Sequence, residues 1–185
     1  LPEPRYSYAS VVHDNKYYVI GGIDTNATNS VYVYDPATDG WDISKTSMSA
    51  ARSNFSAGLL NGKIVAAGGY GSIPLSSVEI YDIAGDVWAP AEPMPYTWLN
   101  AADGVIDDRF LVMVGGWESG LNSGSNRVHI YDIVQDSWSL MPRFNHSLYG
   151  SEGAGDGTDF WVVSGRIYED DAFLNSTYTT KMARC

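Results

Sequence analysis

A pair of glycines recurs at a nearly constant interval along the whole chain, and this period limits the possible folds more than any other feature. The first three pairs follow one another at intervals of 47 residues, and a degenerate fourth pair comes 49 residues after the third. The four pairs are Gly21-Gly22, Gly68-Gly69, Gly115-Gly116 and Ser164-Gly165. Self-similarity at a period of this length indicates a repeat architecture, in which each repeat is one supersecondary unit that packs against its neighbours.

The residues before each glycine pair have the pattern of a β-hairpin. Each pair ends a short apolar run, such as Tyr17 to Ile20 or Ile64 to Ala67. Each run follows a two-residue turn signal: Asp14-Asn15, Asn61-Gly62, Asp107-Asp108 and Asp156-Gly157. Asn, Asp and Gly tolerate the positive φ angles of two-residue hairpin turns. Every repeat is therefore predicted to begin with two antiparallel strands.

A second pattern follows in three of the repeats, where a Tyr-Asp pair closes a strand and a Trp stands seven residues after the Tyr. The residues are Tyr34, Tyr81 and Tyr131, with Trp41, Trp88 and Trp138. Large, flat, amphipathic side chains suit the packing of one repeat onto the next. We expect these residues to be structural rather than a stacking platform for a ligand.

The apolar run, the double glycine and the spaced Tyr and Trp together resemble the kelch repeat, over essentially the whole chain. The resemblance implies an all-β fold, a β-propeller in which each repeat is one four-stranded antiparallel blade. The blades are expected at about residues 5–47, 52–94 and 99–142, with a partial fourth blade at about 148–185. Innermost strands crowd around a narrow axis, and small residues such as Ser56, Ala57 and Gly58 suit them.

The fourth repeat is expected to be incomplete. Tyr178 aligns with the strand-closing tyrosines, and Cys185 then stands at the Trp position. Two explanations are open. The chain is part of a larger ring of six or seven blades, or its open edges are completed by further copies of itself, because unpaired edges template pairing.

Composition excludes some functions and favours others. The formal net charge of −11 argues against nucleic acid and against anionic membrane surfaces, because both are bound by clustered Lys and Arg. No apolar run reaches the 18 or more residues of a membrane span, and the single cysteine, Cys185, forms no internal disulfide. Four N-x-S/T sequons, at Asn26, Asn54, Asn145 and Asn175, predict N-linked glycans and an extracellular or cell-surface location.

No catalytic constellation is recognisable. The three histidines, His13, His129 and His146, do not occupy equivalent repeat positions with metal-ligand partners. Some kelch propellers are copper radical oxidases that need a Tyr-linked Cys, and the terminal position of Cys185 argues against that activity. Glu169, Asp170 and Asp171 with Glu118 could hold Ca²⁺ or form a solvated acidic loop, and the second reading is preferred. We therefore expect neither enzymatic activity nor a cofactor.

The long loops carry the candidate binding residues. In such a blade, the loop between the second and third strands and the connection between blades emerge on the same face. The candidates on this face are Tyr70, Trp98, Trp117, Arg166 and Tyr168. The alternative is that these side chains only pack their own loops. The four sequons also lie on or beside this face, and glycans there would bias binding towards the opposite face or the blade edges.

The prediction that follows is a non-catalytic, protein-binding or adhesive scaffold module of an extracellular glycoprotein. The alternatives are a structural subunit of an extracellular assembly and a fragment of a galactose-oxidase-like propeller enzyme. In the first two cases the partner is another protein or further copies of the same one.

Overall fold

The computed structural model describes residues 1–118, 124–163, 166–167, 172–173 and 177–181. Three four-stranded antiparallel sheets follow one another along the chain, each with its strands in sequence order. The first contains β1 (Ala9–His13), β2 (Lys16–Ile20), β3 (Val31–Asp35) and β4 (Gly40–Asp42). The second contains β5 (Ser56–Leu60), β6 (Lys63–Ala67), β7 (Val78–Asp82) and β8 (Val87–Ala91). The third contains β10 (Ala102–Ile106), β11 (Phe110–Val114), β13 (Val128–Asp132) and β14 (Ser137–Met141).

A fourth sheet has three strands within the described residues: β16 (Glu152–Gly155), β17 (Asp159–Val163) and β20 (Thr177–Lys181). Two small sheets lie beside the third and fourth blades. One pairs β9 (Trp98–Leu99) with β12 (Trp117–Glu118), and the other joins β15 (Leu148–Tyr149), β18 (Arg166–Ile167) and β19 (Ala172–Phe173). In the described part of the chain there is no helix long and apolar enough to cross a membrane. The expected all-β fold with four-stranded antiparallel blades is confirmed.

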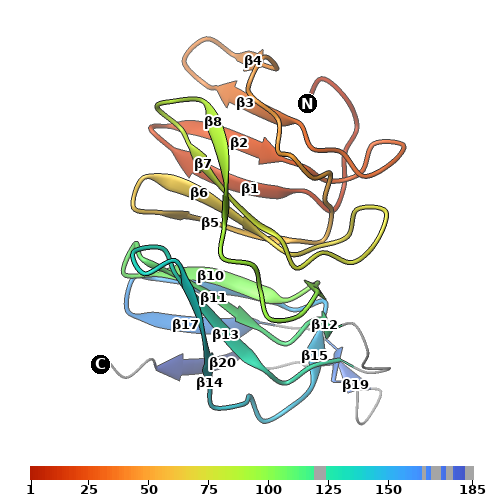
Figure 1. Cartoon of the computed structure of the whole chain (residues 1–185), viewed down its shortest axis with the longest axis vertical. Coiled ribbons are helices and arrows are strands. Elements are labelled where there is room, and N and C mark those ends of the chain that lie inside the picture. The colour runs from red at the N-terminus through yellow and green to blue at the C-terminus, as the bar shows by residue number, and fades with distance from the viewer. Residues whose placement is uncertain (119–123, 164–165, 168–171, 174–176, 182–185) are drawn as a thin grey trace.

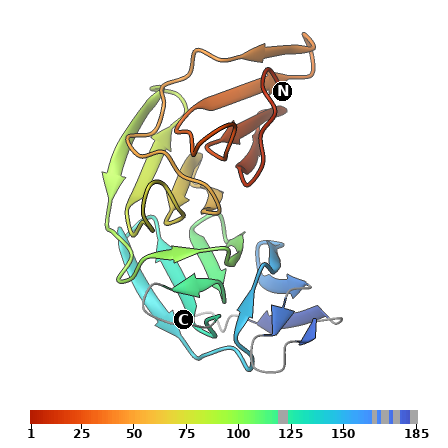
Figure 2. The same ribbon diagram turned by 90° about the vertical axis from the view of Figure 1, so that its right-hand side faces the viewer.

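The four blades stand side by side along an open arc (Figures 1 and 2). Their first strands lie on the concave side of the arc and contact one another in order, β1 with β5, β5 with β10 and β10 with β16. Each core fills the space between two neighbouring blades, as where Tyr18 and Val33 of the first blade pack with Ile64 and Tyr81 of the second.

At two glycines of the first strands, the neighbouring first strand lies so close that there is no room for a side chain. A Cβ added to Gly104 would lie 2.9 Å from the backbone N of Gly155, and one added to Gly153 would lie 2.7 Å from the backbone N of Asp103. Van der Waals overlap at this distance forces the backbone to move. The expectation of small residues around the axis is therefore confirmed.

The double glycine is a joint between blades. Both residues of the first three pairs have positive φ, as in Gly68 at 66° and Gly69 at 92°, a conformation that glycine adopts without steric cost. The second glycine donates its N–H across to the connection that enters the next blade, from Gly22 to the Arg52 carbonyl at 2.8 Å and from Gly69 to the Trp98 carbonyl at 2.6 Å. A Cβ on the first glycine would collide with the same connection.

The pair Gly68→Ala and Gly62→Ala separates this collision from backbone strain. Both glycines have positive φ, but a Cβ on Gly68 would lie 2.5 Å from the Trp98 carbonyl oxygen, whereas one on Gly62 meets nothing within 4 Å. We expect Gly62→Ala to lower the free energy of unfolding by about 1 kcal/mol and Gly68→Ala to add about 1–2 kcal/mol to that loss. Urea denaturation of both variants measures the difference. Equal losses would contradict a steric role for Gly68.

In the second and third blades, the repeated Tyr and Trp hold the blade together and tie it to the preceding one. Tyr81 stacks on Trp88 with ring centroids 4.9 Å apart, and Trp88 Nε1 donates to the Thr46 carbonyl of the first blade at 3.0 Å. The Tyr81 hydroxyl donates to Asp86, which also accepts the Thr46 N–H. The third blade repeats the arrangement, with Trp138 Nε1 donating to the Glu92 carbonyl. The predicted structural role of these residues fits this geometry.

The alignment of the fourth repeat proposed from the sequence is wrong by two residues. In the first three blades the closing Tyr pairs with the residue four before the double glycine, for example Ile64 with Tyr81. In the fourth blade the corresponding Phe160 pairs with Thr180, whereas Tyr178 pairs with Val162. Thr180 therefore occupies the closing position. The connection before β20 is as long as the one before β13, so the error came from aligning on a tyrosine that stands two residues before the closing position. Residue 185 lies outside the described residues.

Candidate functional site

The connections between blades and the loops between second and third strands lie together at one end of the blades, which we call the loop face. They are joined by backbone pairing: Tyr6 bridges Ile23 in the first blade and Ser53 bridges Tyr70 in the second. In the third and fourth blades the same pairing forms β9 with β12 and β15 with β18. The predicted placement of both kinds of loop on one face is confirmed.

Three tyrosines on the loop face are exposed, and we call them the rim tyrosines: Tyr6 at 61%, Tyr70 at 43% and Tyr96 at 41% of their surface. Ile73, in the same loop as Tyr70, is 64% exposed. The Arg127 guanidinium lies over the Tyr96 ring, 4.6 Å from its centroid. Exposed aromatic side chains in loops are typical of protein contact surfaces.

Beneath the loop face, each of the first three blades has a pair of side chains at equivalent positions, and all of these residues are buried except the half-buried Tyr32. One member precedes the first strand and the other is the second residue of the third strand. The pairs are Arg5 with Tyr32, Arg52 with Glu79, and Trp98 with His129. The Arg5 guanidinium lies 4.2 Å from the Tyr32 ring centroid, and Trp98 meets His129 edge to face at 4.4 Å.

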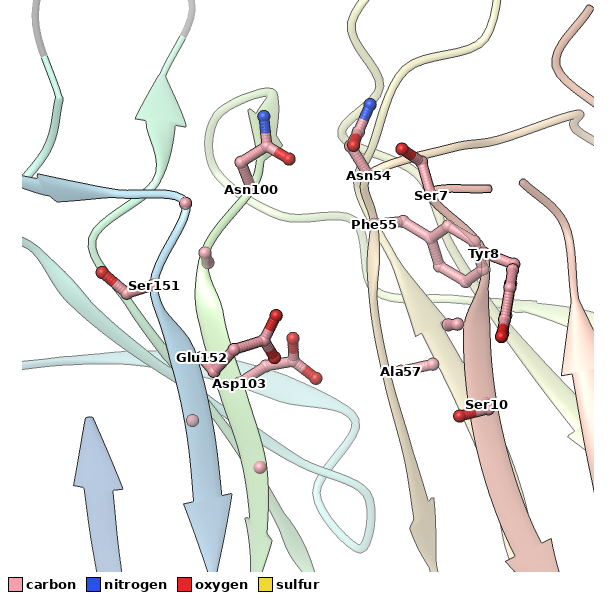
Figure 3. A pocket seen from close by; sticks show the side chains of 15 residues that line it. Ser7, Tyr8, Ser10, Asn54, Phe55, Ala57, Asn100, Asp103, Ser151 and Glu152 are labelled. Carbon is pink, nitrogen blue, oxygen red and sulfur yellow. The ribbon is translucent and has the colours of Figure 1, made fainter. Parts of the chain in front are cut away.

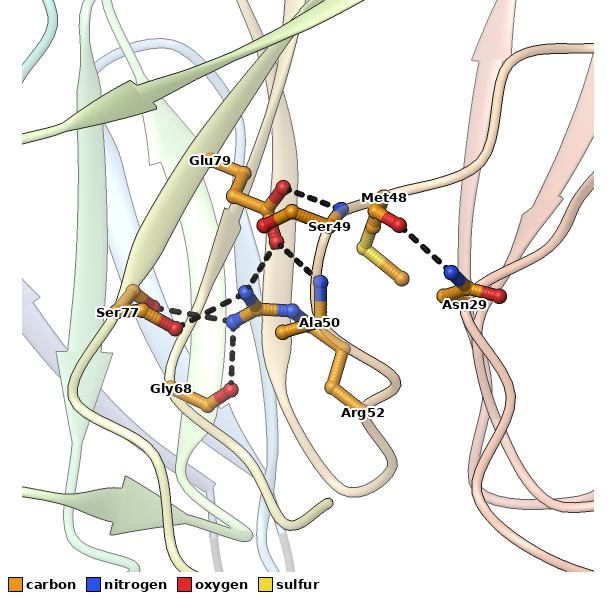
Figure 4. A network of polar contacts seen from close by, with 8 residues as sticks. All are labelled: Asn29, Met48, Ser49, Ala50, Arg52, Gly68, Ser77 and Glu79. Atoms are coloured by element: carbon orange, nitrogen blue, oxygen red, sulfur yellow. Dashed lines mark hydrogen bonds and ion pairs between the residues drawn. The ribbon is translucent and has the colours of Figure 1, made fainter.

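The middle pair is a buried salt bridge (Figure 4). Arg52 donates to the Gly68 and Ser77 carbonyls and to Glu79, at 2.7 Å for the last. Glu79 also accepts the backbone N–H groups of Ser49 and Ala50. The network therefore fastens the connection before the second blade to its second and third strands.

The pair in the third blade carries a titratable group. His129 is fully buried, and neither of its ring nitrogens has a hydrogen-bond partner among the described residues. Burial, and next the charge of Arg127, lower the pKa of His129 to about 4. The imidazole is therefore neutral at pH 7, which fits its contacts with the Trp98 and Trp138 rings.

A cavity of about 510 Å³ lies on the concave side of the arc, between the first strands of the blades (Figure 3). We call it the axial cavity. Its lining includes Tyr8, Asn54, Asn100, Asp103 and Glu152.

One row of residues at the start of the first strands forms a backbone ladder at the mouth of this cavity. Asn54 N–H donates to the Ser7 carbonyl at 3.0 Å, Asn100 N–H to the Asn54 carbonyl at 3.0 Å, and Gly150 N–H to the Asn100 carbonyl at 3.3 Å. All four residues have positive φ, which Asn and Gly tolerate best. The ladder holds the four blades in register around the mouth.

Asp103 and Glu152 come from neighbouring strands, β10 and β16, and their carboxyl groups lie near each other in the cavity (Figure 3). Burial raises the pKa of Asp103 to about 7, and the charge of Glu152 adds to this, whereas Ser56 and the Ala57 backbone lower it. A carboxyl group with this pKa changes charge near neutral pH.

With this geometry established, comparison with known proteins identifies the family. The model of the KLHDC2/KLHL20/DRC7 Kelch-repeats domain matches residues 1–169. The chain belongs to the kelch-repeat family. The solved structure of YjhT superimposes on the kelch chain with a TM-score of 0.76 at 18% identity, covering 88% of this chain and 59% of YjhT. That likeness shows the propeller fold.

Curated relatives are longer kelch proteins. Human Kelch-like protein 34 is 29% identical over 178 residues, which cover 83% of this chain and 27% of that protein. Human Kelch repeat and BTB domain-containing protein 12 is 30% identical over 166 residues, which cover 76% of this chain and 26% of that protein. The kelch chain therefore spans about a quarter of the length of these two relatives.

The structure places the five predicted binding residues of the kelch chain in different environments. Tyr70 is exposed on the loop face, and Trp117 is partly buried in β12. Trp98 was predicted to face a partner, and this is wrong: its side chain is fully buried against His129. The backbone of Arg166 lies in β18, but its side chain and the whole of Tyr168 lie outside the described residues.

The asparagines of the predicted glycosylation sites and the acidic residues of the possible Ca²⁺ site also lie in different environments. Asn26 and Asn145 are exposed, Asn54 is half-buried at the mouth of the axial cavity, and Asn175 lies outside the described residues. Residues 169–171 of the possible Ca²⁺ site lie there too, and Glu118 is buried and paired with Arg127 at 2.9 Å. Among the described residues no group of three or more His, Cys, Asp or Glu side chains could hold a metal ion.

Sequence reasoning missed Tyr6, Tyr96, Asp103 and Glu152. Tyr6 and Tyr96 stand in the connections, where the glycine period gives no signal of exposure. Asp103 had a detectable signal, because it is the one carboxylate in a strand position that Ser10, Ala57 and Gly153 fill in the other blades.

Proposed function

We propose that this kelch chain is a protein-binding module and that its loop face carries the contact surface. The observation that supports this is the exposure of the three rim tyrosines together with Ile73. Tyrosine is enriched at protein interfaces because it combines a large apolar ring, a hydroxyl group and few rotatable bonds. The fold alone does not decide function, so the proposal depends on these side chains.

The relatives support a binding role in larger proteins. The names of several combine kelch repeats with a second domain, as in Kelch repeat and BTB domain-containing protein 12 and F-box/kelch-repeat protein SKIP30 of Arabidopsis thaliana. A module joined to different domains fits a scaffold that presents a variable binding face. The ring of six or seven blades remains a prediction, which a structure of the full-length protein would check.

The test compares two triple variants. Tyr6→Ser, Tyr70→Ser and Tyr96→Ser alter the loop face, whereas Val12→Ser, Val87→Ser and Val134→Ser alter similarly exposed residues at the opposite end of the blades. A partner is first identified by affinity capture and mass spectrometry, and the purified partner is then titrated by calorimetry. We expect the loop-face variant to raise Kd at least about tenfold, the size of effect that loss of interface tyrosines produces.

The control variant is expected to bind like the wild type, and circular dichroism verifies that both variants are folded. Full affinity of the loop-face variant, with loss of affinity in the valine variant, would place the contact surface at the opposite end and overturn the proposal.

We further propose that the protein is an extracellular glycoprotein, as its sequons predict. Support comes from the exposure of Asn26 and Asn145 in surface loops, where an oligosaccharide can be accommodated. Expression through a secretory pathway followed by peptide mass spectrometry should find glycan at Asn26 and Asn145. Bare asparagines at both sites would remove this proposal without affecting the binding role.

A further inference from the structure

The axial cavity has an unbalanced charge. Asp103 and Glu152 contribute two carboxyl groups, and among the described residues no Lys, Arg or His lines the cavity. The remaining polar lining consists of amides and hydroxyl groups, including Asn54, Asn100 and Tyr8. The cavity therefore presents oxygen acceptors and carries no cation of its own.

We propose that the axial cavity binds a cationic side chain of the protein partner, an arginine or a lysine, through the carboxylates of Asp103 and Glu152. This proposal rests on the proposed binding function and specifies that the partner residue recognised in the cavity is positively charged. The end of the cavity nearest the loop face, its mouth, is lined by Ser7, Asn54 and Asn100, which precede the first strands. A partner seated on the rim tyrosines would therefore be able to insert one side chain along the axis.

The shape and lining fit a long basic side chain. A volume of about 510 Å³ lies in the range of ordinary ligand sites. Lysine and arginine have aliphatic stems that pack on apolar or aromatic surface while the charged end reaches polar groups. Tyr8, which is 37% exposed and lines the cavity, offers an aromatic face for such a stem or for the guanidinium plane.

A metal ion fits less well. Ca²⁺ takes six to eight oxygen ligands, usually from several carboxylates. The cavity offers two carboxyl groups, and no group of three or more potential metal-ligating side chains exists among the described residues. An ammonium group has three N–H donors and a guanidinium five, and these can be accepted by the two carboxylates together with the neighbouring amide and hydroxyl oxygens.

The state of Asp103 gives further support. Burial raises its pKa to about 7, with a contribution from the charge of Glu152, and no cationic side chain offsets the shift. A bound cation would stabilise the ionised carboxylate. Asp103 thus has hydrogen-bond partners in Ser56 and Ala57 but no counter-charge among the described residues.

The experiment titrates the kelch chain with Nα-acetyl-L-arginine methylamide at pH 8 and follows the backbone amides of Asp103 and Glu152 by ¹H–¹⁵N NMR. Nα-acetyl-L-norleucine methylamide, which has a similar stem and no charge, is the ligand control. We expect the arginine derivative to shift these amides, and Asp103→Asn and Glu152→Gln each to raise its Kd several-fold, up to about tenfold, through loss of a charged contact.

Asp14→Asn is the matched protein control. It removes the same charge from the chain, but at a turn residue whose side chain is 85% exposed and lies outside the cavity. We expect its Kd to equal that of the wild type. Equal weakening by Asp14→Asn would show a general effect of net charge, and shifts by CaCl₂ but not by the arginine derivative would show a metal site. Either result would overturn the proposal.

The outcome is separable from that of the proposed function. If the rim-tyrosine variant loses the partner while Asp103→Asn and Glu152→Gln bind both partner and arginine derivative normally, the loop face is the contact surface and the cationic site is wrong. If the arginine derivative binds as expected and the rim-tyrosine variant retains the partner, the cavity site holds and the placement of the contact surface is wrong.

Discussion

Replacing Arg52 by alanine is expected to lower the free energy of unfolding by about 3–5 kcal/mol. The side chain is fully buried, and its guanidinium donates to the Gly68 and Ser77 carbonyls and to Glu79. Without Arg52, the carboxylate of Glu79 remains buried without its counter-charge. Removing one member of a buried ion pair is costly for this reason, even where the pair itself contributes little.

The pKa of Glu79 describes the same balance. Burial acts to raise it, but bonds from Ser49 and from Arg52 hold it below the usual value. Arg52→Ala removes one of the contributions that keep the pKa of Glu79 low. We therefore expect the difference in unfolding free energy between wild type and variant to become smaller at low pH, where Glu79 is protonated. Urea denaturation at pH 7 and pH 5 measures both effects.

The double variant Arg52→Met with Glu79→Leu is the control. It replaces both charges by apolar side chains, and such replacements are often neutral or stabilising. We expect it to be more stable than Arg52→Ala. A single variant that costs less than about 1 kcal/mol, or a double variant as unstable as the single one, would show that the buried charge of Glu79 is not the cause.

Acidification is expected to destabilise the third blade through His129. The pKa of this residue is about 4 in the folded protein, because of burial and then Arg127, against about 6.5 in an unfolded chain. Between these values the unfolded state binds more protons than the folded state, so stability falls as the pH falls. The contribution is complete above pH 6.5 and amounts to about 3 kcal/mol, lost progressively as the pH approaches 4.

His129→Leu tests this expectation, because leucine is of similar size and has no charge to acquire. The wild type and the variant are unfolded by urea at several values between pH 7.5 and pH 4.5. Other groups titrate in this range in both proteins, so the difference between the two curves isolates His129. We expect the unfolding free energy of the variant to rise relative to that of the wild type as the pH falls. Parallel plots of unfolding free energy against pH would show that His129 is not the acid-sensitive group.

The repeat pattern was sufficient to predict the blades because the signals are local. A double glycine, a two-residue turn and a short apolar run each fix the backbone within a few residues. The fourth repeat shows the limit of such reasoning. Tyr178 was the nearest tyrosine to the expected position, but strand pairing with β17 places Thr180 there, and register is decided by a partner strand distant in sequence.

The candidate site was predicted only in part. The loop face followed from topology, and Tyr70 is exposed on it. Trp98 was predicted to be exposed, but it occupies the position that Arg5 and Arg52 occupy in the preceding blades. This position lies beneath the connection between blades, and the sequence pattern did not indicate that. Burial there depends on the side chain of the third strand, His129, which lies 31 residues away in the sequence.

The sequence by itself determined the repeat, the strand order within each blade, the position of the double glycine after each second strand and the acidic net charge. Tertiary structure decided which aromatic side chains are exposed, which charged groups are buried in pairs, and that Asp103 and Glu152 share one cavity. The physical reason is that strand and turn formation depend on neighbouring residues. Exposure and the environment of a charge depend instead on residues distant in sequence, such as Glu79 for Arg52 within one blade and Glu152 for Asp103 in the adjacent blade (Figure 3).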